Sequence, residues 1–308
     1  MTLTQLRTFL AVAELGSVRA AAALLVVSQP AVSGAVAALE RELGVELVAP
    51  DGRGLRVTPT GEAFAGSVRT CLQHLDRGVR IARSVEEPGR GAVRIASIAT
   101  AAERMLLPQL AEFRREYPEA EVTVRVGNRA TVWSALASLD ADLVVGGRPP
   151  ASLGALVLGR ATNELVVVGP PGQASELDSK RSVRTYLAGA TWLLREEGSG
   201  TRDATEQLLA QLGVDPPRMI LGSNGAVEEA VVAGFGVALL PRGAVGRRLA
   251  MGAVSAVDCP GTPIDRPWHL VASGEVALSP TARLAARSLL GSADGFCPTA
   301  EGRRLLRG

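Results

Sequence analysis

GSVRAAAALLVVSQPAVSGAVAALERELGVELV, residues 16–48, is the stretch that decides the fold of the N-terminal part of this chain. Ser17 and Ser28 are preferred N-cap residues, because a serine hydroxyl can accept a hydrogen bond from a free N–H group of the first turn. Pro30 is tolerated close after Ser28, where its missing N–H costs nothing. Gly44 suits the left-handed conformation that ends many helices. The stretch therefore predicts two helices joined by a tight turn, the second ending near Gly44.

A further amphipathic helix precedes this stretch, since apolar residues recur at helical spacing before Gly16. The three predicted helices lie at about 3–15, at 18–25 and from Ser28 to about Leu43. The last two form a helix-turn-helix pattern, in which the second helix enters the major groove of DNA. Gln29 and Ser33 fall near the N-terminal end of that helix. Glutamine can pair with adenine, and serine can bond a base edge or a phosphate.

Residues 45–57 are predicted to form two short strands around the turn Asp51-Gly52-Arg53-Gly54. This hairpin is the wing, and Arg53 and Arg56 are its candidate contacts to phosphates or the minor groove. The predicted DNA contacts are Ser17, Arg19, Ser28, Gln29, Pro30, Ser33, Arg53 and Arg56. The alternative is that these polar residues only cap a helix or solvate a turn.

The run 16–48, followed by the hairpin and by Thr58-Pro59-Thr60-Gly61, resembles the DNA-binding domain of LysR-type transcriptional regulators. Two departures from that pattern concern DNA affinity. Gly34 stands where these regulators usually carry a larger polar or basic residue, and Leu47-Val48-Ala49-Pro50 replaces a Leu-Phe-x-Arg run. Residues 1–60 hold five arginines (7, 19, 41, 53 and 56) and five acids (14, 40, 42, 46 and 51). We therefore expect weak non-specific binding with a shallow salt dependence.

A long helix is predicted after the wing, because Thr58 and Pro59 are start signals. Apolar residues then recur at spacings of four and three, as in a coiled-coil seam: Phe64, Val68, Cys71, Leu75 and Val79. Pairing of this seam with a second copy would present two heads to double-stranded DNA with dyad-symmetric half-sites. The alternative is packing against the chain's own head. The predicted boundaries are 1–58 for the winged helix-turn-helix, 59–87 for the linker helix and 88–91 for a hinge.

The composition points away from catalysis, metal binding and membranes. Cys71, Cys259 and Cys297 are far apart and form no CxxC pair, so no metal site is expected. His74 and His269 are the two histidines, and we expect both on the surface or in packing rather than as catalytic bases. No apolar run approaches the roughly 20 residues of a membrane span, and no signal-peptide pattern is seen. We therefore expect a cytoplasmic protein without cofactor or metal.

Strand-like and helical segments alternate from Ala92 onward, which favours an α/β fold with largely parallel sheets. In such folds ligands settle where strand ends meet helix N-termini. Three segments fit that position: 97–100, 127–131 and 195–202. Their hydroxyls and free N–H groups, with Arg129 or Arg202, predict an anion site. Helix capping alone is the alternative for Ser199 and Thr201.

This region resembles the effector domain of LysR-type regulators, and segments 126–150 and 195–202 are similar to the carbon-fixation (CbbR-like) branch. The resemblance implies two periplasmic-binding-protein-like lobes, with lobe I at about 92–162 and 268–308 and lobe II at about 163–267. It also implies a small anionic metabolite as effector. The candidate effector-binding residues are Ser97, Thr100, Asn128, Arg129, Arg148, Ser199, Gly200, Thr201, Arg202 and Asn224.

Residues and resemblance together predict a LysR-type DNA-binding transcriptional regulator that is not an enzyme and whose promoter binding responds to a small metabolite. The predicted fold class is α/β with an N-terminal, mainly-α winged helix-turn-helix and a two-lobed C-terminal domain. We expect a homodimer that assembles further into a homotetramer. The alternative hypothesis is a cytosolic small-molecule-binding or enzymatic α/β protein whose N-terminal helices serve assembly.

Overall fold

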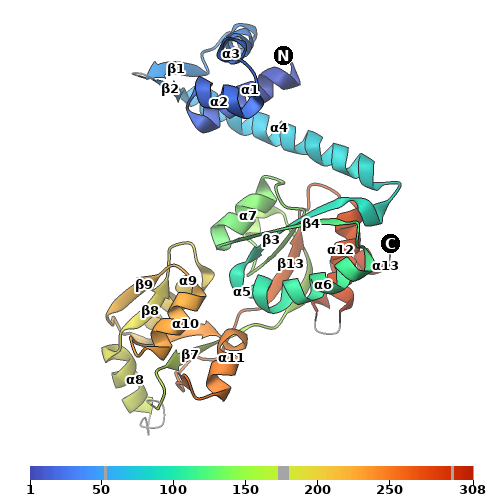
Figure 1. Cartoon of the computed structure of the whole chain (residues 1–308). Helices are drawn as coiled ribbons and strands as arrows, with labels where there is room; N and C mark the ends of the chain where they lie inside the picture. Colours follow the sequence, from blue (N-terminus) through green and yellow to red (C-terminus); the bar gives the residue numbers. More distant parts are fainter. Residues whose placement is uncertain (52–53, 173–179, 293–294, 308) are drawn as a thin grey trace. The chain divides into compact units, whose positions relative to one another are not determined.

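The computed structural model describes residues 1–51, 54–172, 180–292 and 295–307. The chain divides into two compact units, Met1–Ala82 and Arg83–Gly308 (Figure 1). We call the first unit the head and the second the effector-binding unit. Each has its own hydrophobic core, so each is described by itself.

The head is built from helices closed by local caps and from one hairpin. Its elements are α1 (Leu3–Leu15), α2 (Val18–Leu25), α3 (Gln29–Leu43), β1 (Val48–Asp51), β2 (Gly54–Val57) and α4 (Pro59–Ser84). The hydroxyls of Ser17 and Ser28 accept from the backbone N–H groups three residues later. Gly16 and Gly44 end α1 and α3 in the left-handed conformation. The predicted helix-turn-helix and its wing are confirmed as structural elements.

The core of the head holds helices α1 to α4 together. Phe9 and Leu39 are completely buried in it, and the Phe9 ring lies 5.6 Å from the ring of Phe64 in α4. Gly61 allows α4 to pass the wing closely, because a Cβ there would lie 2.1 Å from the Leu47 carbonyl oxygen. The first half of α4 is therefore an integral part of the head.

The effector-binding unit begins with lobe I, a six-stranded sheet with helices on both faces. Its elements are β3 (Ala92–Ile98), α5 (Ala99–Ala101), a π-helical turn (Ala102–Leu106), α6 (Leu107–Glu116), β4 (Glu121–Gly127), α7 (Arg129–Ala137), β5 (Leu143–Gly146), β6 (Leu156–Ala161), β13 (Trp268–Ala272), α12 (Pro280–Gly291), β14 (Cys297–Pro298) and α13 (Ala300–Arg307). The strand order is β14-β6-β13-β5-β3-β4. Strand β3 runs parallel to β4 and β5, whereas β13 is antiparallel to β5 and β6. One core lies under α6 and α12, and a second lies under α7.

Lobe II is a smaller α/β unit inserted between the two halves of lobe I. Its elements are β7 (Glu164–Gly169), α8 (Lys180–Gly189), β8 (Trp192–Arg195), α9 (Gly200–Leu212), β9 (Arg218–Leu221), α10 (Asn224–Val232), β10 (Ala238–Pro241), α11 (Arg242–Ala250), β11 (Ser255–Ala256) and β12 (Ile264–Asp265). Strand β7 pairs with β10, β11 and β12, and β8 runs parallel to β9. A bridge from Trp192 to Val237 connects the two groups of strands.

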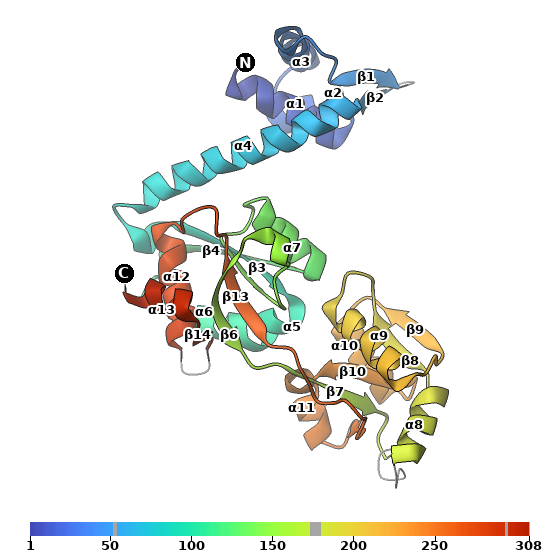
Figure 2. The same ribbon diagram turned by 180° about the vertical axis from the view of Figure 1, so that it is seen from behind.

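The chain crosses between the lobes twice, from β6 to β7 and from β12 to β13 (Figure 2). The two crossover segments are bonded to each other. Arg266 N–H donates to the Asn163 carbonyl (2.8 Å), and Asn163 Nδ2 donates to the Arg266 carbonyl (2.9 Å). The predicted fold class, a mainly-α winged head followed by a two-lobed α/β unit, is confirmed.

Residues 88–91, which the sequence assigns to a hinge, adopt a short 3₁₀ turn over Pro88–Arg90. Arg90 forms ion pairs with Glu87 (2.6 Å) and Glu119 (2.7 Å). A Cβ at Gly91 would lie 2.1 Å from Thr281 Oγ1 of α12, so the backbone approaches lobe I closely there. This connection is packed against lobe I rather than free.

Over the described residues, no single helix is long and apolar enough to cross a membrane. Helices α2 and α3 are long and apolar enough only when they are taken together, and the chain bends by 107° at the break between them.

Candidate functional site

The N-terminal end of α3 is the candidate DNA-reading surface of the head. Gln29, Ala31 and Ser33 are exposed there, whereas Val32 and Val36 of the same helix are buried. The Ser28 hydroxyl accepts from Ala31 N (3.4 Å), so Ser28 is at least a cap. Pro30 is exposed in the first turn. The helix therefore offers small polar groups to a ligand while its apolar stripe holds the head together.

The head neutralises many of its own charges. Arg7 pairs with Asp76 (3.3 Å), Arg69 pairs with Glu14 (3.0 Å), and the N-terminal amine pairs with Glu42. Exposed Arg19 and Arg56 have no carboxylate within 4.0 Å among the residues that the structure describes. Ser17 caps α2 through Ala20 N (3.2 Å). Arg53, the predicted contact at the tip of the wing, lies outside the described residues.

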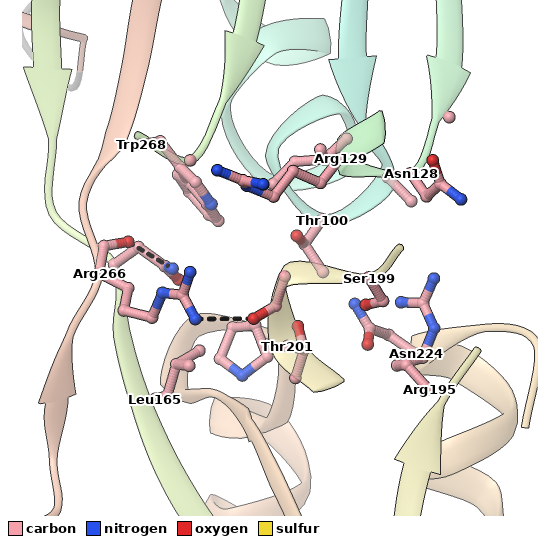
Figure 3. Close-up of a pocket in the computed structure, with 17 residues that line it drawn as sticks. Thr100, Asn128, Arg129, Leu165, Arg195, Ser199, Thr201, Asn224, Arg266 and Trp268 are labelled. Carbon is pink, nitrogen blue, oxygen red and sulfur yellow. Dashed lines mark hydrogen bonds between the residues drawn. The ribbon is translucent and has the colours of Figure 1, made fainter. Parts of the chain in front are cut away.

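A cavity that is partly open to solvent lies between the two lobes of the effector-binding unit (Figure 3). Lobe I contributes its strand and helix ends near Thr100 and Asn128, and lobe II contributes the starts of α9 and α10. Its lining is Ile98, Ala99, Thr100, Gly127, Asn128, Arg129, Gly147, Asn163, Leu165, Arg195, Ser199, Gly200, Thr201, Asn224, Pro241, Arg266 and Trp268. Both crossover segments thus supply residues to the same cavity.

Three helices of eight or more residues begin at this cavity. Helix α7 begins at Arg129, α9 at Gly200 and α10 at Asn224. Asn128 caps α7 by accepting from Thr131 N (3.0 Å), whereas the Ser199 side chain makes no cap bond to α9. Helix N-termini carry partial positive charge and free N–H groups. The cavity therefore has an electropositive wall even before its side chains are counted.

Among the described residues, three arginines line the cavity and no Asp or Glu does. Arg195 is held by a bidentate pair with Glu196 (2.7 and 2.8 Å). Arg266 Nη1 donates to the Gly200 carbonyl (2.7 Å). Arg129 has no carboxylate within 4.0 Å among the described residues. Figure 3 shows Arg129 and Arg266 reaching toward the same space beside Trp268.

The Arg266 guanidinium is affected both by burial and by the charges around it. Burial lowers the pKa of the Arg266 guanidinium below its ordinary value; Asp203 opposes this shift and Arg129 adds to it. Two guanidinium groups without a lining carboxylate gain free energy when an anion enters between them. The charge of the lining therefore favours a negatively charged group over a positive one.

The remaining lining residues indicate which uncharged groups a ligand would carry. Ile98, Leu165, Pro241 and the ring of Trp268 form apolar surface. The Oδ1 atom of Asn224 is buried and has no hydrogen-bond partner among the described residues. A buried, unpaired acceptor costs free energy unless a bound molecule or water satisfies it. A small molecule with an anionic group, a hydroxyl or amide donor and a short carbon skeleton fits this set.

The structure brings most of the predicted effector residues into one cavity: Thr100, Asn128, Arg129, Ser199, Gly200, Thr201 and Asn224. The other three do not line it. Ser97 is fully buried in β3, and its hydroxyl donates to the Ile98 carbonyl (3.1 Å). Arg202 turns toward Glu206 (2.8 Å). Arg148 is exposed near His269 instead. Their part in effector binding stays a prediction.

The sequence-based prediction missed Asn163, Arg195, Arg266 and Trp268. Arg195 ends β8 and was within the predicted segment 195–202, although it was not singled out. Asn163, Arg266 and Trp268 belong to the crossover region, about 100 residues apart in the chain. Nothing in their local pattern marks a ligand site, because only the two crossings bring them to the cleft.

The predicted coiled-coil seam divides into two parts. Val68 is 3% exposed and packs in the head's core, and Phe64 is half-buried against Phe9. The assignment of Val68 to an intermolecular seam is therefore wrong, because it has almost no surface left to bury, and Phe64 chiefly serves the head. Cys71, Leu75 and Val79 are exposed.

Two of the groups that could support catalysis or bind metal, Cys259 and His269, are buried, whereas His74, Cys71 and Cys297 are exposed. The described residues contain no cluster of three or more His, Cys, Asp or Glu side chains able to hold a metal ion. Burial raises the pKa of the Cys259 thiol to about 11, so it is protonated at neutral pH. His269 is buried, and burial, followed by the nearby Arg160, lowers its pKa.

The winged helix-turn-helix and the electropositive interlobe cavity define a class, that of DNA-binding proteins that respond to a small ligand. Residues 3–62 match the bacterial regulatory helix-turn-helix family of LysR type, and residues 86–294 match the LysR substrate binding domain. The chain belongs to the LysR family of transcriptional regulators. This is a family of regulators rather than enzymes, so the alternative of an enzymatic or purely solute-binding protein is wrong.

Known relatives agree with this assignment over most of the chain. The chain is 35% identical to the HTH-type transcriptional regulator CbbR of Rhodospirillum rubrum over 91% of its length and 93% of that protein. The crystal structure of CbnR, a LysR family regulator, superposes with a TM-score of 0.66 at 23% identity, covering 94% of this chain and 99% of CbnR. The regulatory domain of CcmR from Synechocystis PCC6803, in complex with 2-PG, has a TM-score of 0.57 at 26% identity and covers 64% of this chain and 97% of that domain.

Proposed function

We propose that this regulator binds a small anionic metabolite in the interlobe cavity and that binding changes its affinity for promoter DNA. The observation that carries the proposal is the convergence of Arg129, Arg266 and three helix N-termini on one cavity, where no carboxylate of the described residues belongs to the lining. The CcmR regulatory domain, which was solved with 2-PG, supports a phosphorylated or carboxylated ligand.

The effector acts by shifting a population of conformations. Thr100 and Arg129 belong to lobe I, whereas Thr201 and Asn224 belong to lobe II, so one ligand can contact both lobes at once. Such a ligand stabilises the lobe spacing that satisfies all its contacts and depletes the others. Because α4 is the covalent connection between the effector-binding unit and the head, the change reaches DNA through that helix and through the assembly.

The head supplies the DNA contacts, through Gln29 and Ser33 on α3 and through Arg19 and the wing arginines. Exposed Cys71, Leu75 and Val79 on α4 support pairing with a second copy. A homodimer presents two heads to dyad-symmetric half-sites, and two dimers complete a homotetramer. Because it binds the chromosome, the protein works in the cytoplasm.

Thermal unfolding in the presence of phosphorylated and carboxylated metabolites tests this proposal. A ligand at 100 times its Kd stabilises the folded state by about 2.7 kcal/mol, which is readily measured. Arg129→Ala and Thr201→Ala are expected to abolish this stabilisation and the effector response in a gel shift, while DNA binding without effector persists. Arg125→Ala, an exposed arginine on the neighbouring strand β4, is the matched control. Unchanged ligand affinity in both cavity variants would remove these residues from the site.

A further inference from the structure

A direct hydrogen bond connects the two lobes away from the crossover segments. Arg104 of lobe I donates through Nη2 to the carbonyl oxygen of Ala244 in lobe II, at 2.8 Å. The two residues are 140 positions apart in the sequence. Ala244 lies in the first turn of α11, and Figure 1 shows α11 beside α5. A charged donor makes a stronger bond to a carbonyl than a neutral one does.

The position of Arg104 along the chain ties it to the cavity. It lies in the π-helical turn Ala102–Leu106, which directly follows cavity residues Ile98, Ala99 and Thr100. A π turn inserted in a helix costs stability and is frequent at functional sites. Here it places a cation of lobe I one turn beyond the cavity wall.

The surface that Arg104 meets on lobe II is acidic and half-buried. Glu228 of α10 pairs with Arg248 of α11 (3.4 Å), and Arg248 also pairs with Glu229. Burial raises the pKa of the Glu228 carboxyl, and Arg248 and then Arg104 counteract that shift, while Glu103 adds to it. Arg104 therefore lies close enough to Glu228 to interact with its charge as well as with Ala244.

Helix α10 connects this contact to the ligand. Its first residue, Asn224, lines the cavity with a buried acceptor that has no partner among the described residues, and Glu228 follows one turn later. Arg104, Thr100 and Arg129 belong to lobe I, whereas Ala244 and Asn224 belong to lobe II. A change of lobe spacing that breaks the Arg104 bond is therefore expected to change the distance across the cavity as well. The Arg104 bond, which lies outside the cavity, thus helps to fix the distance between its two sides.

We propose that Arg104 is a positioning residue that holds the two lobes at the spacing in which the effector is bound, without touching the effector itself. The inference rests on the proposed function, which takes the cavity to be the effector site, but the bond between the lobes is independent of which ligand binds. If the binding-competent spacing becomes a minor state, apparent affinity falls in proportion to its population.

The experiment compares Arg104→Ala with Arg115→Ala, which removes an arginine of similar chemistry from the exposed end of α6. Spin labels at Ser134→Cys in α7 and Gln211→Cys in α9 report the interlobe distance, with exposed Cys71 and Cys297 replaced by serine in every sample. Calorimetry with inorganic phosphate and with 2-PG reports affinity. Arg104→Lys serves as the conservative variant, because its ammonium can still donate.

We expect Arg104→Ala to lengthen and broaden the distance distribution of the ligand-free protein and to weaken probe affinity about tenfold, the size of one charge-assisted hydrogen bond. Arg115→Ala should change neither, and Arg104→Lys should recover part of both. An unchanged distance distribution, or an unchanged affinity despite a changed distance, overturns the positioning role. If no probe binds even the unmutated protein, the proposed ligand class fails, and the distance measurement still decides the role of Arg104.

Discussion

In the head, the candidate DNA contacts on the helices come from one continuous stretch, Ser17 to Ser33, whereas the cavity residues come from segments spread between Ile98 and Trp268. The charges differ as well. The head neutralises arginines against its own acids, while Arg129 and Arg266 face a cavity that no carboxylate lines in the part of the chain that the structure describes. The candidate DNA-reading surface depends mainly on its own capped helices, whereas the cavity depends on how the whole effector-binding unit packs. A substitution in the head should therefore leave ligand binding intact, and a substitution in the cavity should leave the fold of the head intact.

The largest expected effect tests whether the two units are independent. Leu39→Ala removes a fully buried side chain from the head's core and should cost about 2–5 kcal/mol of its stability. Chemical unfolding followed by circular dichroism should show an early transition of the head, with ligand-dependent stabilisation of the later one retained. A single cooperative transition that shifts as a whole would contradict the separation into two units.

A smaller effect separates true cavity residues from neighbouring arginines. Arg266→Met removes a guanidinium that lines the cavity and should weaken binding of an anionic ligand about 10- to 100-fold, since charged hydrogen bonds contribute about 1.5–3 kcal/mol. Arg202→Met is the control, because Arg202 pairs with Glu206 outside the lining. Calorimetric titration measures both. Equal losses in the two variants would support the sequence-based assignment of Arg202 to the effector site.

The smallest expected effect concerns the weakly charged head. A Cβ at Gly34 meets no atom within 4 Å, so Gly34→Arg should fold normally and add one cation to the exposed face of α3. We expect a several-fold gain in DNA affinity and a salt dependence steeper by about 0.9 in log–log slope, as for one additional phosphate contact. Gly34→Gln is the uncharged control. Binding titrations over a range of salt concentrations would contradict this prediction if the slope stayed the same.

Local interactions explain why the head could be predicted in detail. Ser17, Ser28, Gly16 and Gly44 act within one or two turns of their own positions, and the structure shows the expected cap or left-handed residue at each. The sequence-based prediction went wrong where it assigned a packing partner to a residue. Val68 has seam spacing, yet it packs on the head, because helical periodicity marks an apolar stripe without saying what covers it.

The cavity could be predicted only in part. Asn128, Arg129, Ser199 and Thr201 follow strand ends, where α/β folds place their ligands, and they line the site. Ser97 has the same local setting, but the pleat of β3 turns its side chain into the protein interior. Arg266 and Asn163 carried no signal of their own, since their meeting requires two crossings about 100 residues apart.

By itself, the order of residues determined the caps, the helical stripes, the alternation of strands and helices and the polar residues and arginines at certain strand ends, because each of these depends on neighbours along the chain. The tertiary structure alone decided which of those ends share a cavity, which arginines enter it and how Arg104 reaches the other lobe. Contacts between distant segments depend on how whole sheets and helices pack, and no local pattern encodes that packing.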